Sequence, residues 1–190
     1  MTTRHNVGYF IGSLSSTSIN RRLSTALIRL APPELTMTEI SFRELPLYSQ
    51  DYDADYPPVA RAFKQSISKV DAILFITPEF NRSIPGALKN AIDWASRPYG
   101  QNAFTRKPTG VIGASIGAIG TALAQQSLRA VLAFCDAPQM TSPEAYIQYK
   151  DGLITDDGKV TVDSTHEFLK NYMKQFHEFV TRVRSALPKD

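Results

Sequence analysis

The chain has 190 residues, of which 43% are hydrophobic and 21% are charged. These proportions are typical of a soluble globular protein, and they exclude intrinsic disorder and collagen-like or low-complexity architectures. The formal net charge is +3 and the pI is about 9.0, with basic and acidic residues spread along the chain. Because this positive charge is mild and dispersed, it suits anionic small molecules at least as well as nucleic acid, and it supports neither strongly. We expect small-molecule ligands and no nucleic-acid partner.

The cysteine content and the apolar runs bear on the compartment. The single cysteine, Cys135, can form no internal disulfide and excludes cysteine-only zinc sites and CxxC redox chemistry. The apolar run at 7–11 near the N-terminus is too short for a signal peptide. No stretch approaches the roughly 20 apolar residues of a membrane span. We expect a soluble, cytoplasmic protein that has no membrane partner and binds no metal.

Short apolar runs alternate with amphipathic stretches along the whole chain. Leu23, Leu27 and Leu30 recur at helical spacing, and the run at 72–76 is apolar throughout, as in parallel strands buried on both faces. In chain order we expect a strand at 7–11, a helix at 19–30, a strand at 35–42, a helix around 59–67, a strand at 72–76, a helix from 85, a strand at 109–114, a helix around 118–134, a strand near 138–141 and a helix at about 164–187.

Five strands that alternate with five helices, with no break in composition, predict a single doubly wound α/β domain over residues 1–190. In such sheets, ligands bind beyond the carboxyl ends of the strands, at the point where the strand order reverses. The loops at 12–20, 77–84 and 113–118 therefore become the candidate binding loops.

The loop that follows the first strand is rich in hydroxyl groups. It leads into a helix, whose N-terminus offers free N–H groups and a partial positive charge to anions. The side chains that could surround a phosphate there are those of Ser13, Ser15, Thr17, Ser18 and Asn20. Neither GxxxxGK[ST] nor GxGxxG occurs at this loop. A turn whose hydroxyls only cap the helix stays open as an alternative.

The loop after the third strand could face a planar ligand. Its backbone amides, the Asn81 amide and the Phe80 ring could all meet such a ligand. Glu79 is a candidate general acid or base, although the sequence shows no carboxylate partner for it. A tight turn with a surface carboxylate is the alternative interpretation.

The sequence also has features of two alternative classes of protein, a serine hydrolase and an electron carrier. GASIG at 113–117 matches the GxSxG elbow of α/β serine hydrolases, with Ser115 as nucleophile, and Asp163 and His166 follow in the required order. However, Asp163 and His166 lie only three residues apart, and no HGGG-type oxyanion segment is visible. A non-enzymatic, flavodoxin-type electron carrier is the third class; such carriers are usually acidic, which a pI near 9.0 disfavours.

Two runs, IGSLSSTSIN at 11–20 and LFITPEFNRSIPGALKNAIDWASR at 74–97, resemble the NADPH-dependent FMN reductase family, which includes bacterial chromate and quinone reductases and azoreductases. The resemblance covers nearly the whole chain. It implies a flavodoxin-like, three-layer fold with a five-stranded parallel sheet of order 2-1-3-4-5. It also implies a homodimer or homotetramer. The implied activity passes hydride from NADPH or NADH through bound FMN to a quinone, azo, flavin or metal-oxyanion acceptor.

Carried over residue by residue, the resemblance also implies which positions hold the cofactor. The family's FMN phosphate loop is matched by Ser13, Ser18, Ile19 and Asn20, and Ser15 in the same loop is expected to be among the cofactor-binding residues. The segment along the isoalloxazine ring is matched by Pro78, Glu79, Phe80 and Asn81, and the third loop touching the ring by Ser115, Ile116 and Gly117. The family usually has arginine where this chain has Ser15, so a charged phosphate or nucleotide contact is missing there. No catalytic side chain is implied, since FMN carries the chemistry.

Overall fold

The computed structural model describes residues 3–187. Strands and α-helices alternate along the chain, as the sequence predicts. In order they are β1 (His5–Ile11), α1 (Ile19–Leu30), β2 (Leu35–Glu39), the short 3-10 helix η1 (Gln50–Tyr52), α2 (Pro58–Ser68), β3 (Ala72–Ile76), α3 (Gly86–Ser96), β4 (Thr109–Ser115), α4 (Ala122–Phe134), β5 (Tyr146–Gln148) and α5 (Asp163–Ala186).

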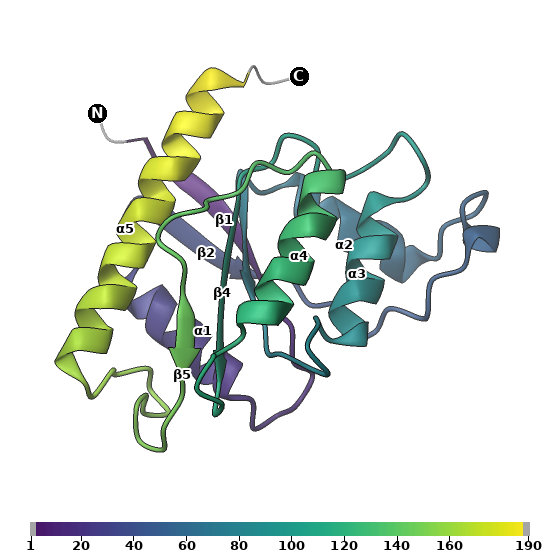
Figure 1. Cartoon of the computed structure of the whole chain (residues 1–190). Coiled ribbons are helices and arrows are strands. Elements are labelled where there is room, and N and C mark those ends of the chain that lie inside the picture. Colours follow the sequence, from purple (N-terminus) through teal and green to yellow (C-terminus); the bar gives the residue numbers. More distant parts are fainter. Residues whose placement is uncertain (1–2, 188–190) are drawn as a thin grey trace.

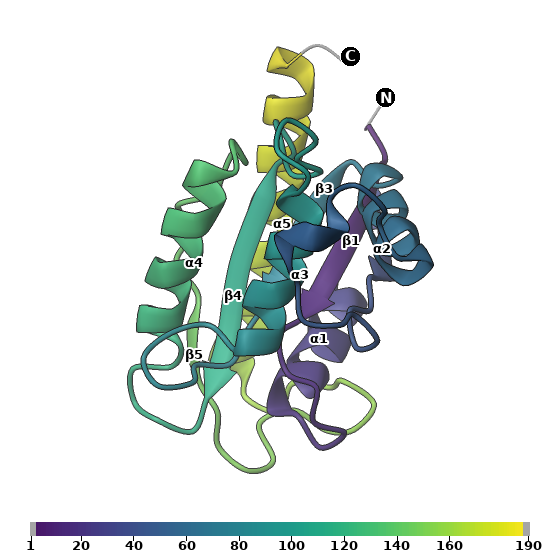
Figure 2. The same ribbon diagram turned by 90° about the vertical axis from the view of Figure 1, so that its right-hand side faces the viewer.

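The strands form one parallel sheet of order β2-β1-β3-β4-β5. This order confirms the predicted flavodoxin-like fold. Helices cover both faces of the sheet: α1 and α5 lie on one side, and α2, α3 and α4 lie on the other (Figures 1 and 2). No helix within residues 3–187 is both long and apolar enough to cross a bilayer.

The two faces of the sheet explain why β3 is apolar throughout. Successive side chains of a strand point to opposite faces. Leu74 and Ile76 therefore enter the core under α1 and α5, whereas Ile73 and Phe75 enter the core under α2, α3 and α4. On the second side, the rings of Phe10 and Phe75 lie 5.1 Å apart at the centre of an aromatic group. Burial on both faces holds β3 in a fixed register, so the loop that follows it starts from a rigid support.

Three predicted elements differ from the structure: the second strand ends at Glu39 rather than at 42, the fifth strand lies elsewhere, and the fourth helix begins later. The strand predicted near 138–141 is wrong: only Gln139 bridges there to Thr109, and the fifth strand is β5, which pairs with Gly113–Ser115. A strand of three residues is too short to produce a recognisable periodicity. The fourth helix begins at Ala122 rather than near 118, because Gly120 has a φ of 59°, outside the helical region.

Candidate functional site

Three loops meet at the carboxyl end of the sheet, which is the lower end in Figure 1. They follow β1, β3 and β4 and comprise residues 12–18, 77–85 and 116–121. Hydrogen bonds to the neighbouring strand fix where the first two loops begin: the Gly12 N–H donates to the Ile76 carbonyl of β3 at 2.8 Å, and the Thr77 N–H donates to the Ile112 carbonyl of β4 at 3.0 Å. The structure therefore brings together the three segments that the sequence singled out.

The hydroxyls of the first loop are arranged to donate to an anion. Ser18 is the N-cap of α1, and its Oγ accepts the Asn20 N–H at 3.2 Å, while Ser13 Oγ accepts the Ser15 N–H at 3.3 Å. A hydroxyl can also donate one proton, and neither the Ser13 nor the Ser18 hydroxyl donates to another group within residues 3–187, so both protons stay available to an anion. The loop contains no acidic residue, and neither does the first turn of α1, which starts at Ile19. This donor set fits a phosphate group at a helix N-terminus.

Asn20 uses its amide within the protein. Its side chain is 1% exposed; Nδ2 donates to the Ala114 carbonyl and Oδ1 accepts the Ala114 N–H, both at 2.9 Å. The amide that the sequence suggested for the phosphate thus joins the start of α1 to the end of β4. Asn20 fixes the first loop relative to the third, and we assign it a positioning role.

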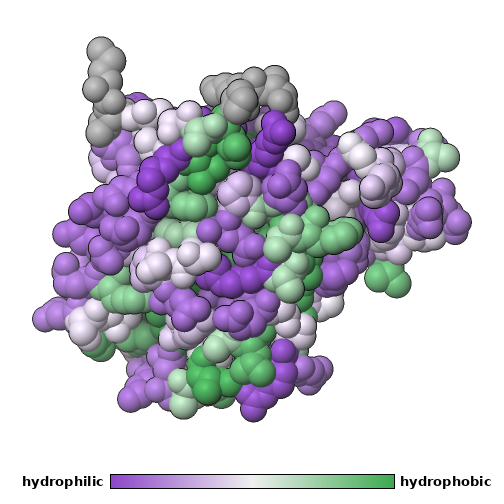
Figure 3. Space-filling view, turned by 45° about the horizontal axis from the view of Figure 1, so that its top comes forward, coloured by the Kyte–Doolittle hydropathy of each residue, from purple (hydrophilic) through white to green (hydrophobic). Residues whose placement is uncertain are grey.

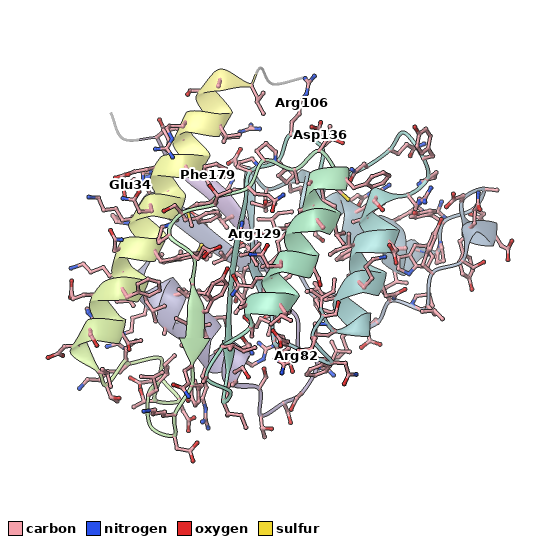
Figure 4. All side chains as sticks on the ribbon, in the orientation of Figure 1. Glu34, Arg82, Arg106, Arg129, Asp136 and Phe179 are labelled. Atoms are coloured by element: carbon pink, nitrogen blue, oxygen red, sulfur yellow. The ribbon has the colours of Figure 1, made fainter. Side chains whose placement is uncertain are left out.

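Glu79 also connects two parts of the site. Its Oε2 accepts the N–H groups of Leu123 and Ala124 at 3.0 and 3.1 Å, so the carboxylate caps the N-terminus of α4. A negative charge is favourable at that end of a helix. The Glu79 side chain is only 9% exposed, and Arg82 Nη1 lies 3.5 Å from its other oxygen. In Figure 4, Arg82 lies beside this end of α4. The carboxylate considered as a general acid or base is therefore occupied as a helix cap.

A tight turn presents the aromatic ring of the second loop. Pro78 follows β3, and Phe80 and Ser83 then exchange two backbone hydrogen bonds of 2.9 Å. The two residues between them, Asn81 and Arg82, have φ values of 51° and 63°, as in a two-residue hairpin turn. Within residues 3–187, neither the Asn81 N–H nor the Arg82 N–H donates a hydrogen bond, so both stay available to a ligand. The Phe80 side chain is 54% exposed beside them.

The third loop carries Ser115 and an exposed apolar side chain. Ile116 is 79% exposed, and Ser115 Oγ accepts the Gly117 N–H at 3.2 Å. His166, the residue that a hydrolase would need as its base, is half-buried and has its Nδ1 2.9 Å from Glu167 Oε1. Neither side chain makes the nucleophile–base hydrogen bond that a triad requires.

Charged groups lie on the outer side of the first loop. Arg21 donates two hydrogen bonds of 2.9 Å to Glu39, and this pairing raises the pKa of Arg21 above its ordinary value. Arg43, from the segment after β2, donates from Nη2 to the Leu14 carbonyl at 2.6 Å. Arg43 could not be predicted as part of the site, because nothing in its local sequence pattern places it at a loop 29 residues earlier.

The fold and the site together define a flavodoxin-like protein with a place for a phosphorylated, planar cofactor. The NADPH-dependent FMN reductase family matches residues 5–151. A 2-hydroxy-1,4-benzoquinone reductase from Burkholderia is 47% identical over 92% of this chain and 95% of that protein. A quinone reductase from Pseudomonas putida is 45% identical over 98% of this chain and 100% of that protein. The flavoenzyme FerB, an NAD(P)H:(acceptor) oxidoreductase from Paracoccus denitrificans, superposes with a TM-score of 0.90 at 42% identity, over 94% of this chain and 98% of that one.

The chain belongs to the NADPH-dependent FMN reductase family. It is an oxidoreductase, with FMN as its cofactor and NAD(P)H as its electron donor. The serine hydrolase and the electron carrier are not favoured. The individual cofactor contacts inferred from the sequence stay predictions.

Proposed function

We propose that the protein transfers hydride from NADPH or NADH, through FMN, to a quinone. The observation that carries this proposal is the pairing of two surfaces at one end of the sheet. The hydroxyl-rich, acid-free loop at 12–18 suits a phosphate, and the exposed side chains of Phe80 and Ile116 on the neighbouring loops suit a flat ring. The relatives from Burkholderia and Pseudomonas putida, named as quinone reductases, support the choice of acceptor.

The residues that would hold FMN divide between its two ends. Ser13 and Ser18 would donate hydroxyl protons to the phosphate, together with the N–H groups at the start of α1. The N–H groups at the tip of the 80–83 turn would donate to polar atoms of the ring, where charge develops on reduction. When bound, FMN supplies the hydride-accepting and hydride-donating chemistry. Glu79 and Asn20 keep these donors in place.

The exposed apolar side chains around the site would receive the acceptor. Leu14, Phe80 and Ile116 are 38%, 54% and 79% exposed, and they come from the loops after β1, β3 and β4 respectively. A quinone is flat and largely apolar, so it can pack against such side chains and displace water from them. No acid or base on the protein is needed for this step, which agrees with Glu79 being occupied at α4.

We also propose that the single-domain chain assembles as a homodimer or homotetramer in the cytoplasm. A groove of about 770 Å³ separates α3 and α4, with Ile92 and Val131 in its lining. Phe134 and Tyr99 are both 89% exposed at this groove, which is unusual for large apolar side chains. On the face in Figure 3, hydrophobic residues form patches within a mostly hydrophilic surface. These observations favour the groove as a subunit contact.

Ser115→Ala distinguishes the reductase from the hydrolase. We expect the variant to keep its FMN-dependent quinone reduction within about tenfold of the parent, since one side-chain hydrogen bond contributes about 1 kcal/mol. A hydrolase would lose several orders of magnitude in rate with its nucleophile. The measurement is NADPH oxidation with 1,4-benzoquinone, alongside labelling by a serine-directed fluorophosphonate. Labelling at Ser115, with esterase activity that the variant lacks, would contradict the proposed function.

A further inference from the structure

The first loop has no cation of its own. Residues 12–18 are all uncharged. A phosphomonoester carries about 1.5 to 2 negative charges near neutral pH, whereas a helix N-terminus contributes only about half a positive charge. A cation close to the loop would therefore strengthen the binding of a phosphomonoester considerably. The structure shows two arginines at this loop, Arg21 and Arg43, and they differ in what they contact.

Arg21 is already paired. Its two hydrogen bonds to Glu39 fix the guanidinium and neutralise its charge within the protein. Arg43 instead contacts a neutral group, the Leu14 carbonyl, at 2.6 Å. In the described part of the chain, residues 3–187, no carboxylate forms an ion pair with Arg43. Arg43 therefore keeps its full positive charge at the loop.

The position of Arg43 leaves its other donors available. A guanidinium has five N–H donors in a fixed plane, and the Leu14 carbonyl takes only one of them. Arg43 is exposed, and it lines one small crevice together with Ser13, Leu14 and the paired side chains of Arg21 and Glu39. The cation thus lies beside the loop hydroxyls that face an anion, although it comes from the segment after β2. A planar donor fork of this kind suits phosphate oxygens.

We propose that Arg43 contacts a phosphomonoester held at the first loop, and so supplies the charge that residues 12–18 lack. This inference rests on the proposed function, because the two candidate ligands, FMN and NADPH, are the cofactor and the electron donor of that function. The 5′-phosphate of FMN and the 2′-phosphate of NADPH are the same chemical group, and either can be the one that Arg43 contacts. Riboflavin and NADH are the matching compounds without that phosphate.

The competing role for Arg43 is mechanical. Its bond to Leu14 could simply hold the loop against the segment after β2. A purely mechanical bond would affect phosphorylated and unphosphorylated compounds to the same extent. A charge contact would affect only the phosphorylated member of each pair. It would also weaken as salt is added, since an exposed contact is screened.

The experiment compares Arg43→Gln, which keeps an N–H donor but no charge, with Arg43→Lys, which keeps the charge. If the contact is with FMN, we expect Arg43→Gln to raise the Kd of the apoprotein for FMN about tenfold at low salt and to leave the Kd for riboflavin unchanged. If the contact is with NADPH, we expect the KM for NADPH to rise by a similar factor and the KM for NADH to stay unchanged. Arg43→Lys should retain most of the parent's affinity. Arg29→Gln is the matched control, because Arg29 is exposed, pairs with Asp157 and lies at the other end of α1.

Each result decides the matter. A selective loss for FMN identifies the flavin phosphate, and a selective loss for NADPH identifies the nucleotide phosphate. Equal losses within both pairs, or no change in any of the four constants, would overturn the role of Arg43. If the parent protein bound no FMN, the proposed function itself would be overturned. The FMN titration of the parent shows this outcome before any variant is compared with it.

Discussion

Replacing Asn20 by aspartate is expected to lower the free energy of unfolding by about 3 kcal/mol or more and to weaken FMN binding strongly. The Asn20 side chain is 1% exposed and exchanges two hydrogen bonds with the Ala114 backbone. A carboxylate cannot donate to the Ala114 carbonyl, and it would place a charge in a buried site. Asn20→Ala leaves the N–H and the carbonyl of Ala114 without this partner and should lower the free energy of unfolding by about 2 to 4 kcal/mol.

Urea unfolding of the apoprotein measures the first effect, and FMN titration under conditions where the variant is folded measures the second. Asn90 supplies a matched control, because its amide likewise accepts the Tyr48 N–H at 2.8 Å and donates to the Pro46 carbonyl at 2.9 Å. Asn90→Ala should reduce stability and leave the FMN Kd of the folded protein unchanged. If Asn20→Ala also left that Kd unchanged, the positioning role of Asn20 would be refuted.

Gly113→Ala is expected to be the most damaging glycine substitution in the site, with a loss of stability of about 3 kcal/mol or an insoluble product. A Cβ at position 113 would lie 2.1 Å from the Thr77 carbonyl oxygen and 2.3 Å from Thr121 Oγ1. The first contact is with backbone, which cannot move without shifting the end of β3. The strand that carries the 80–83 turn would then be displaced from β4.

Gly117→Ala is the comparison within the same motif. A Cβ there would meet only Ser115 Oγ, at 3.6 Å, which is ordinary contact, so stability should change by less than about 1 kcal/mol. Thermal unfolding of the two variants tests the difference. Equal sensitivity of the two glycines would mean that close packing against Thr77 does not explain Gly113. Close packing thus explains the glycine at 113, whereas the space around position 117 would accept a larger residue.

The fold could be predicted because its signals are local. The run at 72–76 indicated a strand buried on both faces, and the alternation of strands with helices placed the three loops at one end of the sheet. Signals of this kind lie within a few residues of one another. The fifth strand was predicted at 138–141 instead of at β5, because β5 has only three residues. The 138–141 segment does bridge to Thr109, through Gln139.

The site could be predicted only in outline, since its key contacts join distant residues. The amide of Asn20 contacts Ala114, 94 residues later, and the carboxylate of Glu79 caps α4, 44 residues later. Asn20 lies in the first turn of α1 and Glu79 in the loop after β3. Both positions fall in segments that the sequence marked for ligand binding, but no local pattern shows that their side chains bind backbone groups. For the same reason Arg43 could not be connected with the first loop.

Anaerobic reduction of the FMN-loaded protein tests the central claim most directly. The purified protein is saturated with FMN, and its visible flavin absorbance is followed while NADPH and then 1,4-benzoquinone are added in a stopped-flow instrument. We expect NADPH to bleach the flavin band and the quinone to restore it, each much faster than with the same concentration of free FMN. NADH serves as the second donor. A flavin band that stays oxidised with both donors, or rates equal to those of free FMN in both steps, would contradict the account.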